Sequence, residues 1–123
     1  MQQMDVKGAY LNGTLKERVY MRQPEGFEDG TGRVCLLTKT LYGLKQSCCE
    51  WNIELDNKMR KHRYTRLRSD PCAYVRRHRG ELAIVTVWVD DVLLFAPSET
   101  TMKGVKDDLH AKWQVTDLGE PSK

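Results

Sequence analysis

Apolar residues recur along this chain with two different periods, and the period changes in a readable order. In residues 47–64 and again in residues 98–113 they return at the spacing of one helix face, which predicts two amphipathic helices. Ser47, or alternatively Gln46, lies at the start of the first segment, and Ser98 lies at the start of the second. Because serine is a favourable N-cap residue, these positions predict where the helices begin.

Shorter runs rich in β-branched and aromatic residues predict strands. These runs cover residues 34–41, 72–77, 81–89, 92–96 and 114–119. The second and third runs flank "HRG", which is typical of a β-hairpin turn. Residues 2–6 are too short for their pattern alone to define a strand, although Met4 and Val6 alternate around Asp5.

Turn-forming residues separate these elements. "LNG" at 11–13 predicts a turn, and "QPEGFEDGTG" at 23–32 predicts a loop because it is dense in proline, glycine and acidic residues. The resulting order is strand, loop, strand, helix, strand, strand-turn-strand, helix, strand. This order is typical of an α+β fold, in which two helices pack on one face of a mostly antiparallel sheet. No repeat, low-complexity segment or linker divides the chain, so we expect one domain over residues 1–123.

The composition is that of a globular chain, with 40% hydrophobic and 30% charged residues. The sequence has no apolar run long enough to span a membrane and no N-terminal signal-peptide layout, so we expect an intracellular protein, not secreted and without a membrane partner. The four cysteines show neither CxxC pairs nor regular spacing, which predicts reduced thiols. A zinc site is disfavoured because adjacent Cys48 and Cys49 would point to different faces of a helix.

Positive charge is concentrated in residues 58–79. This stretch holds nine lysines and arginines against one acid, Asp70, and so carries a net charge of +8, whereas the whole chain carries +3. Such a block suits a nucleic-acid backbone, because each basic side chain near a phosphate releases condensed counterions. The same pattern also describes a solvated face whose side chains extend their apolar stems along the surface. The charges alone leave both interpretations open.

The run "VWVDDVLLFA" at 87–96 places two adjacent aspartates, Asp90 and Asp91, among apolar residues. Two like charges about 4 Å apart repel by roughly 4 kcal/mol at an effective dielectric constant of about 20. Either exposure in a tight turn or a divalent cation could compensate them. The absence of a glycine for a positive φ angle favours the cation. Asp5, if it lies on a neighbouring strand, would supply the third carboxylate of a two-metal phosphoryl-transfer site.

Three long segments carry a family resemblance. "MDVKGAYLNGTLKERVYMRQPEGF", "CLLTKTLYGLKQSCCEWN" and "VWVDDVLLFA" resemble, in this order, blocks of the reverse transcriptase of copia-type LTR retrotransposons, and "DLGE" is similar to a downstream stretch. The match covers essentially the whole chain. It implies a polymerase palm-like sheet, and a partial domain that lacks the N-terminal part of the fingers, the thumb and ribonuclease H.

The resemblance also implies roles for individual residues. Asp5, Asp90 and Asp91 match the catalytic aspartates of the family. Asp5 and Asp90 would be the main ligands of two Mg²⁺ ions, for which Mn²⁺ is a possible substitute, and the Val6 carbonyl would be an additional ligand.

A second group of residues matches the nucleotide-binding positions. Tyr10 matches the aromatic residue that lies under the incoming sugar and excludes a 2′-hydroxyl. Gly43 would permit close backbone approach, and Lys45 would contact phosphate. Without the family, Tyr10 reads as a core or rim aromatic residue and Gly43 as a simple turn residue.

The implied reaction is RNA-directed DNA synthesis, in which a primer 3′-hydroxyl attacks the α-phosphate of a deoxynucleoside triphosphate on an RNA or DNA template. The remaining implied partner is the rest of the retroelement polyprotein, in the cytoplasm or in a virus-like particle. We expect the fragment to be inactive alone. A non-catalytic retroelement remnant and a basic nucleic-acid-binding module remain alternative functions.

Several positions depart from the family pattern. Trp88 stands where the family usually has tyrosine, and Gly8 stands where threonine is more common. After "LYGLKQ" the run Ser47, Cys48, Cys49 replaces a small residue, proline and arginine. The loss of the arginine removes a phosphate contact and the loss of the proline removes a helix-start signal. These departures suggest drift from selection for activity.

Overall fold

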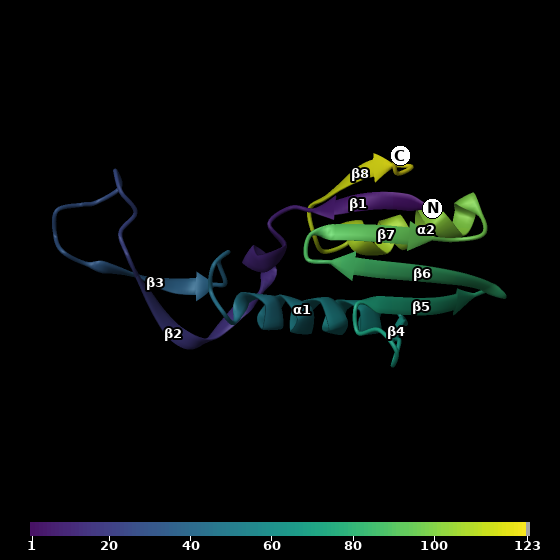
Figure 1. The fold of residues 1–123 in the computed structure, drawn as a ribbon, viewed down its shortest axis with the longest axis horizontal. Helices are drawn as coiled ribbons and strands as arrows, with labels where there is room; N and C mark the ends of the chain where they lie inside the picture. Colours follow the sequence, from purple (N-terminus) through teal and green to yellow (C-terminus); the bar gives the residue numbers. More distant parts are fainter. Residues whose placement is uncertain (123) are drawn as a thin grey trace.

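The computed structural model describes residues 1–122, and in this range it contains two α-helices, one 3₁₀ helix and eight strands (Figure 1). In chain order the elements are β1 (Gln2–Val6), η1 (Ala9–Asn12), β2 (Thr14–Arg22), β3 (Val34–Lys39), α1 (Ser47–Lys61), β4 (Thr65–Arg66), β5 (Ala73–His78), β6 (Glu81–Trp88), β7 (Asp91–Phe95), α2 (Glu99–His110) and β8 (Val115–Gly119). The predicted α+β fold is confirmed.

Six strands form one sheet in the order β4-β5-β6-β7-β1-β8, and every neighbouring pair is antiparallel. The first strand of the chain, β1, therefore lies inside the sheet, between β7 and β8 (Figure 1). This insertion brings the segment around Asp5 next to the segment that begins at Asp91. Residues 2–6, which were too short to define a strand from sequence, thus form a central strand with a hydrogen-bonded neighbour on each side.

One face of the sheet forms the core with both helices. Along β6 the buried residues are Ala83, Val85 and Val87, so this strand turns one set of side chains inward. They belong to a single apolar cluster with α1 and α2, in which the rings of Trp51 and Trp113 meet edge to face at 5.3 Å. Because the helices share this cluster, they cover the same face of the sheet, as predicted.

The helix starts agree with the periodic pattern, with Gln46 as the one of the two proposed caps that α1 uses, but both helices end three residues before the predicted ranges, α1 at Lys61 and α2 at His110. Gln46, not Ser47, is the N-cap of α1, because the Ser47 hydroxyl donates a hydrogen bond to the Leu41 carbonyl instead. The first helix also ends at Lys61, earlier than predicted, because Arg63 adopts a positive φ of 64° and redirects the chain. The predicted Ser98 cap of α2 is confirmed, since its hydroxyl accepts a hydrogen bond from the Thr101 N–H.

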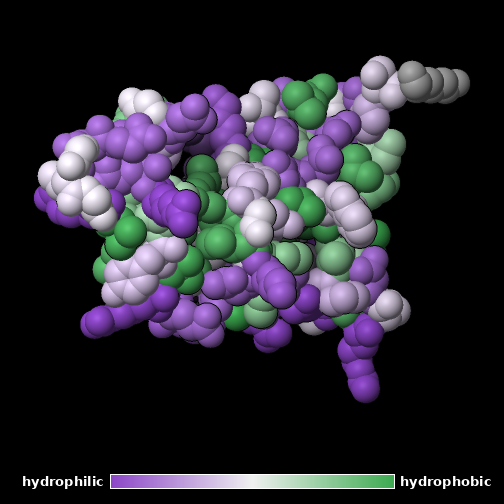
Figure 2. Space-filling view, turned by 60° about the vertical axis from the view of Figure 1, so that its left-hand side comes forward, coloured by the Kyte–Doolittle hydropathy of each residue, from purple (hydrophilic) through white to green (hydrophobic). Residues whose placement is uncertain are grey.

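The ribbon of β2 and β3 extends away from the six-stranded sheet (Figure 1). The sequence pattern predicts β3 but no element for residues 14–22, which form β2. Both strands leave most side chains exposed, including Tyr20, Val34 and Leu36, so no buried face imposes the alternation that marks a strand. Seen from this end of the molecule, apolar groups gather near the middle of the surface and polar groups dominate its edge (Figure 2).

A partly buried polar cluster fastens α2 to β5 and to the end of α1. The Asp108 carboxylate accepts hydrogen bonds from Arg76 at 2.5 Å and from the Tyr64 hydroxyl at 3.2 Å, and it contacts His62 Nδ1 at 2.8 Å. The Arg76 guanidinium also lies 4.5 Å from the centre of the Tyr64 ring, within the range of a cation–π contact. Burial raises the pKa of the Tyr64 hydroxyl, which keeps it protonated as the donor.

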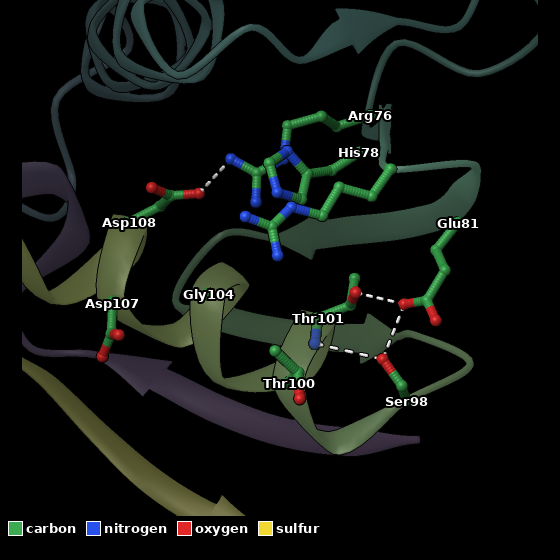
Figure 3. Close-up of a pocket in the computed structure, with 10 residues that line it drawn as sticks. Arg76, His78, Glu81, Ser98, Thr100, Thr101, Gly104, Asp107 and Asp108 are labelled. Atoms are coloured by element: carbon green, nitrogen blue, oxygen red, sulfur yellow. Dashed lines mark hydrogen bonds and ion pairs between the residues drawn. The ribbon is translucent and has the colours of Figure 1, made fainter.

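The beginning of α2 is fastened to the sheet by Glu81. This carboxylate accepts hydrogen bonds from the hydroxyls of Ser98 and Thr101 (Figure 3). Both contacts lower its pKa below the usual value of 4.5. A cavity of about 590 Å³ lies beside this contact, and its walls also carry Arg76 and Asp108, which pair with each other.

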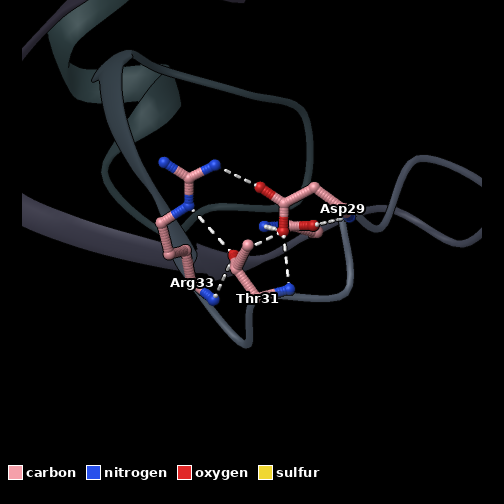
Figure 4. A network of polar contacts seen from close by, with 4 residues as sticks. Asp29, Thr31 and Arg33 are labelled. Atoms are coloured by element: carbon pink, nitrogen blue, oxygen red, sulfur yellow. Dashed lines mark hydrogen bonds and ion pairs between the residues drawn. The ribbon is translucent and has the colours of Figure 1, made fainter.

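The predicted loop at 23–32 joins β2 to β3 and is organised around one carboxylate. Asp29 accepts hydrogen bonds from the backbone N–H of Thr31 at 3.0 Å, from Gln23 and from Arg33 (Figure 4). The Thr31 hydroxyl also donates to this carboxylate, and this contact first, followed by those from Gln23 and Arg33, holds the pKa of Asp29 well below its usual range. The loop is therefore closed by its own side chains although it is exposed.

Close packing at Gly13 gives a first prediction. A Cβ atom here would lie 2.6 Å from Thr40 Oγ1 and 3.2 Å from the Trp51 backbone nitrogen. Gly13→Ala should lower the free energy of unfolding by about 1–3 kcal/mol, because overpacking forces backbone shifts. Gly104→Ala is the matched control, since its nearest neighbour is 3.9 Å away and alanine favours the interior of α2 by about 0.5–1 kcal/mol. Urea denaturation measures both, and equal effects would contradict the packing argument.

The Glu81 contact predicts a pH dependence of stability. Because the folded-state pKa of Glu81 is lowered, its contribution is present above its ordinary pKa of 4.5 and is lost as the pH falls through the folded value. Wild type should therefore lose more thermal stability between about pH 5 and pH 3 than Glu81→Gln does. Thermal melts monitored by circular dichroism check this, with Glu25→Gln in the exposed loop as the control. A parallel decline in wild type and Glu81→Gln would refute it.

Candidate active site

The two adjacent aspartates lie at the tight turn between β6 and β7. Trp88 and Asp91 form the last strand pair, and Val89 and Asp90 are the two residues between them. Val89 has a φ of 56°, which is unusual for a β-branched residue. The sequence argument that a tight turn needs glycine here is therefore wrong, because valine supplies the positive φ angle.

Two hydrogen bonds from distant parts of the chain hold this turn. The indole N–H of Trp51 on α1 donates to the Val89 carbonyl at 2.9 Å, and the Val6 N–H at the end of β1 donates to the Asp90 carbonyl at 2.8 Å. A strained φ angle costs about 1–3 kcal/mol and a hydrogen bond contributes about 0.5–1.5 kcal/mol net, so two such bonds can offset it. Tertiary contacts thus stabilise a turn that the local sequence disfavours.

The three predicted carboxylate residues lie together at the backbone level. Asp5 on β1 is the direct partner of Asp91 on β7, and Asp90 is the preceding residue in the turn. Residues directly opposite each other have Cβ atoms about 4.5–5.5 Å apart and side chains on the same face of the sheet. Among residues 1–122, none of the three carboxylates forms an ion pair with a lysine or arginine. Their mutual repulsion is therefore not offset by a basic side chain.

The side chains themselves are engaged with different neighbours. The Tyr42 hydroxyl donates to Asp90 Oδ2 at 3.1 Å, and Gln3 Nε2 donates to Asp91 Oδ1 at 3.4 Å. Within the described residues, no three histidine, cysteine, aspartate or glutamate side chains lie close enough to hold a metal ion. The donor type nevertheless suits magnesium, because the three neighbouring backbone positions carry carboxylate oxygens, the ligands that this cation takes in proteins.

Two tyrosines form an aromatic wall beside the turn. Tyr10 lies on η1, and its ring centre is 4.7 Å from that of Tyr42 in the loop before α1. Burial is the first cause that raises the pKa of each hydroxyl, and nearby Asp90 raises both further. Gly8 precedes η1 with a φ of 58°, a conformation that glycine adopts without strain.

The other predicted site residues are less closely engaged. Gly43 has a φ of 96°, and no protein atom lies within 4 Å of the position of a Cβ atom, so the turn itself accounts for glycine. Lys45 is exposed and, among residues 1–122, has no ion-pair partner. Val6 is buried, with 1% of its surface exposed, and contributes its N–H to the turn.

An apolar cavity of about 300 Å³ lies behind the turn, between α1 and the end of β6. Tyr10, Trp51 and Val89 are part of its lining. Trp88 also borders it, and 76% of the Trp88 surface is exposed next to Asp91. The site thus combines carboxylates with aromatic and apolar surface.

Folding disperses the basic block of residues 58–79. Lys58 is buried, and Arg60, Arg66 and Arg76 form ion pairs with aspartates. Within residues 58–79, the exposed basic residues that form no ion pair with any described residue are Lys61, Arg63, Arg68, Arg77 and Arg79. The last two lie at the β5–β6 turn, at the opposite end of β6 from Asp90. The candidate metal site and this part of the block are therefore a whole strand apart.

Sequence reasoning did not single out Tyr42 or Trp51. Tyr42 lies inside "LYGLKQ", which the resemblance connects with nucleotide binding, and Trp51 lies on the apolar face of the predicted helix. The motif and the apolar helix face each predict the importance of the segment, but neither predicts the hydrogen bond that its side chain donates to the turn. That contact depends on how α1 packs on the sheet.

Among the described residues, no helix is long and apolar enough to cross a membrane.

Two comparisons with known proteins identify relatives of this chain. The family model described as "Reverse transcriptase (RNA-dependent DNA polymerase)" matches residues 1–123. The chain is 39% identical over 97% of its length to the "Retrovirus-related Pol polyprotein from transposon TNT 1-94" of Nicotiana tabacum, of which it covers 9%. It is 36% identical over 98% of its length to the corresponding polyprotein from transposon RE1 of Arabidopsis thaliana, of which it covers 8%.

A shorter relative is the putative transposon Ty5-1 protein of Saccharomyces cerevisiae, which is 35% identical over 98% of this chain. The chain covers 40% of that protein, so it spans less than half the length of each of these relatives. Because the family model matches the whole chain and the relatives include transposon polyproteins, the predicted resemblance to copia-type enzymes is confirmed. The chain belongs to the reverse transcriptase (RNA-dependent DNA polymerase) family.

Proposed function

We propose that this chain is the palm portion of an RNA-directed DNA polymerase. A primer 3′-hydroxyl attacks the α-phosphate of a deoxynucleoside triphosphate at Asp5, Asp90 and Asp91. The observation that carries the proposal is the register of β1 and β7, which pairs Asp5 with Asp91 next to Asp90, and none of these three aspartates forms an ion pair with a lysine or arginine of residues 1–122. Two divalent ions, Mg²⁺ or in its place Mn²⁺, would activate the attacking hydroxyl and stabilise the leaving oxygens.

The surrounding residues have distinct roles in this proposal. Asp5 and Asp90 hold the metal ions, with the Val6 carbonyl as an additional oxygen ligand. Tyr10 lies under the sugar of the incoming nucleotide, where a rigid ring blocks a 2′-hydroxyl by contact. Its support is the position of its ring next to Tyr42 and Asp90. Gly43 leaves open space at the loop surface for a ligand, and Lys45 contacts phosphate.

The partners of this function are an RNA or DNA template with its primer, deoxynucleoside triphosphates and the remainder of a retroelement polyprotein. We expect them to meet inside the cell, in the cytoplasm or a virus-like particle. Residues 1–123 alone should not extend a primer, because catalysis of this kind depends on holding the duplex and the nucleotide in register. A non-catalytic remnant would have the same fold and differ only in turnover.

A chimera tests the polymerase function. Residues 1–123 replace the matching segment of the tobacco relative's polyprotein, to which they are 39% identical, and primer extension is measured with Mg²⁺ on an RNA template. We expect extension, and a loss of at least about a hundredfold for Asp90→Asn, because the carboxylate charge acts on the transition state. Asp107→Asn on the exposed side of α2 is the matched control.

The outcomes distinguish an active polymerase segment from a non-catalytic remnant. If the chimera is inactive with Asp90 intact while the unmodified tobacco polyprotein is active, the remnant interpretation holds for this chain. If Asp90→Asn and the intact chimera extend the primer equally, the carboxylate assignment is wrong.

The exposed basic residues support a second candidate function, nucleic-acid binding independent of catalysis. Arg77 and Arg79 are exposed and lie far from the carboxylates. Replacing both with alanine should reduce the slope of log affinity against log salt by about 1.4 for single-stranded DNA, at about 0.7 for each of two phosphate contacts. Fluorescence anisotropy across a salt series measures this slope. Arg18→Ala with Arg22→Ala on the ribbon is the matched pair, and an equal reduction there would exclude a localised site.

A further inference from the structure

Tyr42 joins two parts of the candidate active site that are distant in sequence. It belongs to the loop between β3 and α1, and its hydroxyl donates to Asp90 Oδ2 in the β6–β7 turn at 3.1 Å. Its ring packs against Tyr10 at a centre-to-centre distance of 4.7 Å. The tyrosine is 51% exposed, so solvent surrounds the rest of the side chain. Contacts at its two ends therefore fix its position: the ring on Tyr10 and the hydroxyl on Asp90.

The hydrogen bond has a clear electrostatic role in the absence of a cation. Asp90 neighbours Asp91 in sequence, Asp91 faces Asp5, and among residues 1–122 no lysine or arginine pairs with any of them. A hydroxyl donor stabilises a carboxylate more than it stabilises a neutral acceptor. Tyr42 therefore supplies a partner for a carboxylate that otherwise only repels its neighbours.

The same hydrogen bond competes with metal binding. The described side chains contain no group of three carboxylates close enough to hold a metal ion, and one oxygen of Asp90 is already occupied by Tyr42. A cation shared with Asp5 and Asp91 would need the Asp90 carboxylate turned towards them. Because Tyr42 is bonded to Oδ2, such a rotation would lengthen the contact with the tyrosine hydroxyl.

We propose that Tyr42 is a positioning residue that holds the Asp90 carboxylate apart from Asp5 and Asp91 until a divalent cation binds. The inference rests on the proposed function, because it concerns the same three carboxylates. Tyr42 lowers the affinity of the empty site for metal, and Tyr10 keeps its ring within reach of Asp90.

If Tyr42 instead oriented Asp90 towards the metal ion, removing its hydroxyl would change the metal affinity in the opposite direction. A hydrogen-bond donor that orients a metal ligand towards the ion strengthens metal binding, and its removal typically weakens affinity about 10–100-fold. A donor that holds the ligand away weakens binding, and its removal tightens affinity. The direction of the change on removing one hydroxyl group therefore distinguishes the two.

The test measures binding of Mn²⁺ alone to the 123-residue chain, by electron paramagnetic resonance of the free ion. Tyr42→Phe removes the hydroxyl and keeps the ring on Tyr10. We expect its Mn²⁺ affinity to be about threefold to tenfold tighter than wild type, the net worth of one hydrogen bond. Tyr20→Phe on the exposed ribbon is the matched control and should leave the affinity unchanged.

Two further variants, Tyr42→Leu and Asp90→Asn, separate the effect of the tyrosine hydroxyl from the existence of the metal site. Tyr42→Leu, whose fold is checked by circular dichroism, should tighten binding as Tyr42→Phe does if the hydroxyl is responsible. Unchanged or weaker affinity in Tyr42→Phe overturns the proposal, while a loss of binding in Asp90→Asn still supports the metal site. If wild type and Asp90→Asn bind Mn²⁺ equally, both the metal site and the role of Tyr42 towards it are wrong.

Discussion

The geometry of the candidate site depends on two hydrogen bonds to the turn between β6 and β7. Val89 adopts a φ angle that a β-branched side chain disfavours, and Trp51 and Val6 hold the turn through its two carbonyls. Each donor comes from a different element, so the packing of α1 on the sheet and the pairing of β1 with β7 both stabilise the turn. Tertiary contacts, and not the local sequence alone, thus fix the position of Asp90.

This dependence explains which features could be predicted from sequence. The helices and the β5–β6 hairpin were predictable because a buried face enforces a regular period and because Arg79-Gly80 adopts the positive φ angles of a tight turn. Strand β2 was not, because it buries neither face. Ser47 was expected as a cap because serine favours that position, but Leu41 offered its hydroxyl another acceptor. Tyr42 lay in the right segment, although its hydrogen bond depended on folding.

The distribution of charge on the folded protein was the feature that the sequence predicted least well. Residues 58–79 carry +8 along the chain, yet Asp56 and Asp108, both outside that stretch, neutralise three of its arginines in the fold. In contrast, the three carboxylates were spread over 86 residues of sequence and became neighbours. A linear charge count therefore overstated the basic patch and could not reveal the acidic cluster, because antiparallel pairing joins distant segments.

The supports of the fold and the groups proposed for catalysis are different residues. Trp51 and Val6 hold the turn, whereas Asp5 and Asp91 face each other across two strands, and like charges directly opposite each other destabilise a sheet. Replacing one of these aspartates by a neutral residue would relieve repulsion without removing a support. Stability alone therefore gives no reason for aspartates at three neighbouring backbone positions, whereas the proposed binding of a divalent cation does. The departures at Gly8 and Cys48 do not weaken this argument, since the positive φ angle suits glycine and Cys48 is exposed at the start of α1.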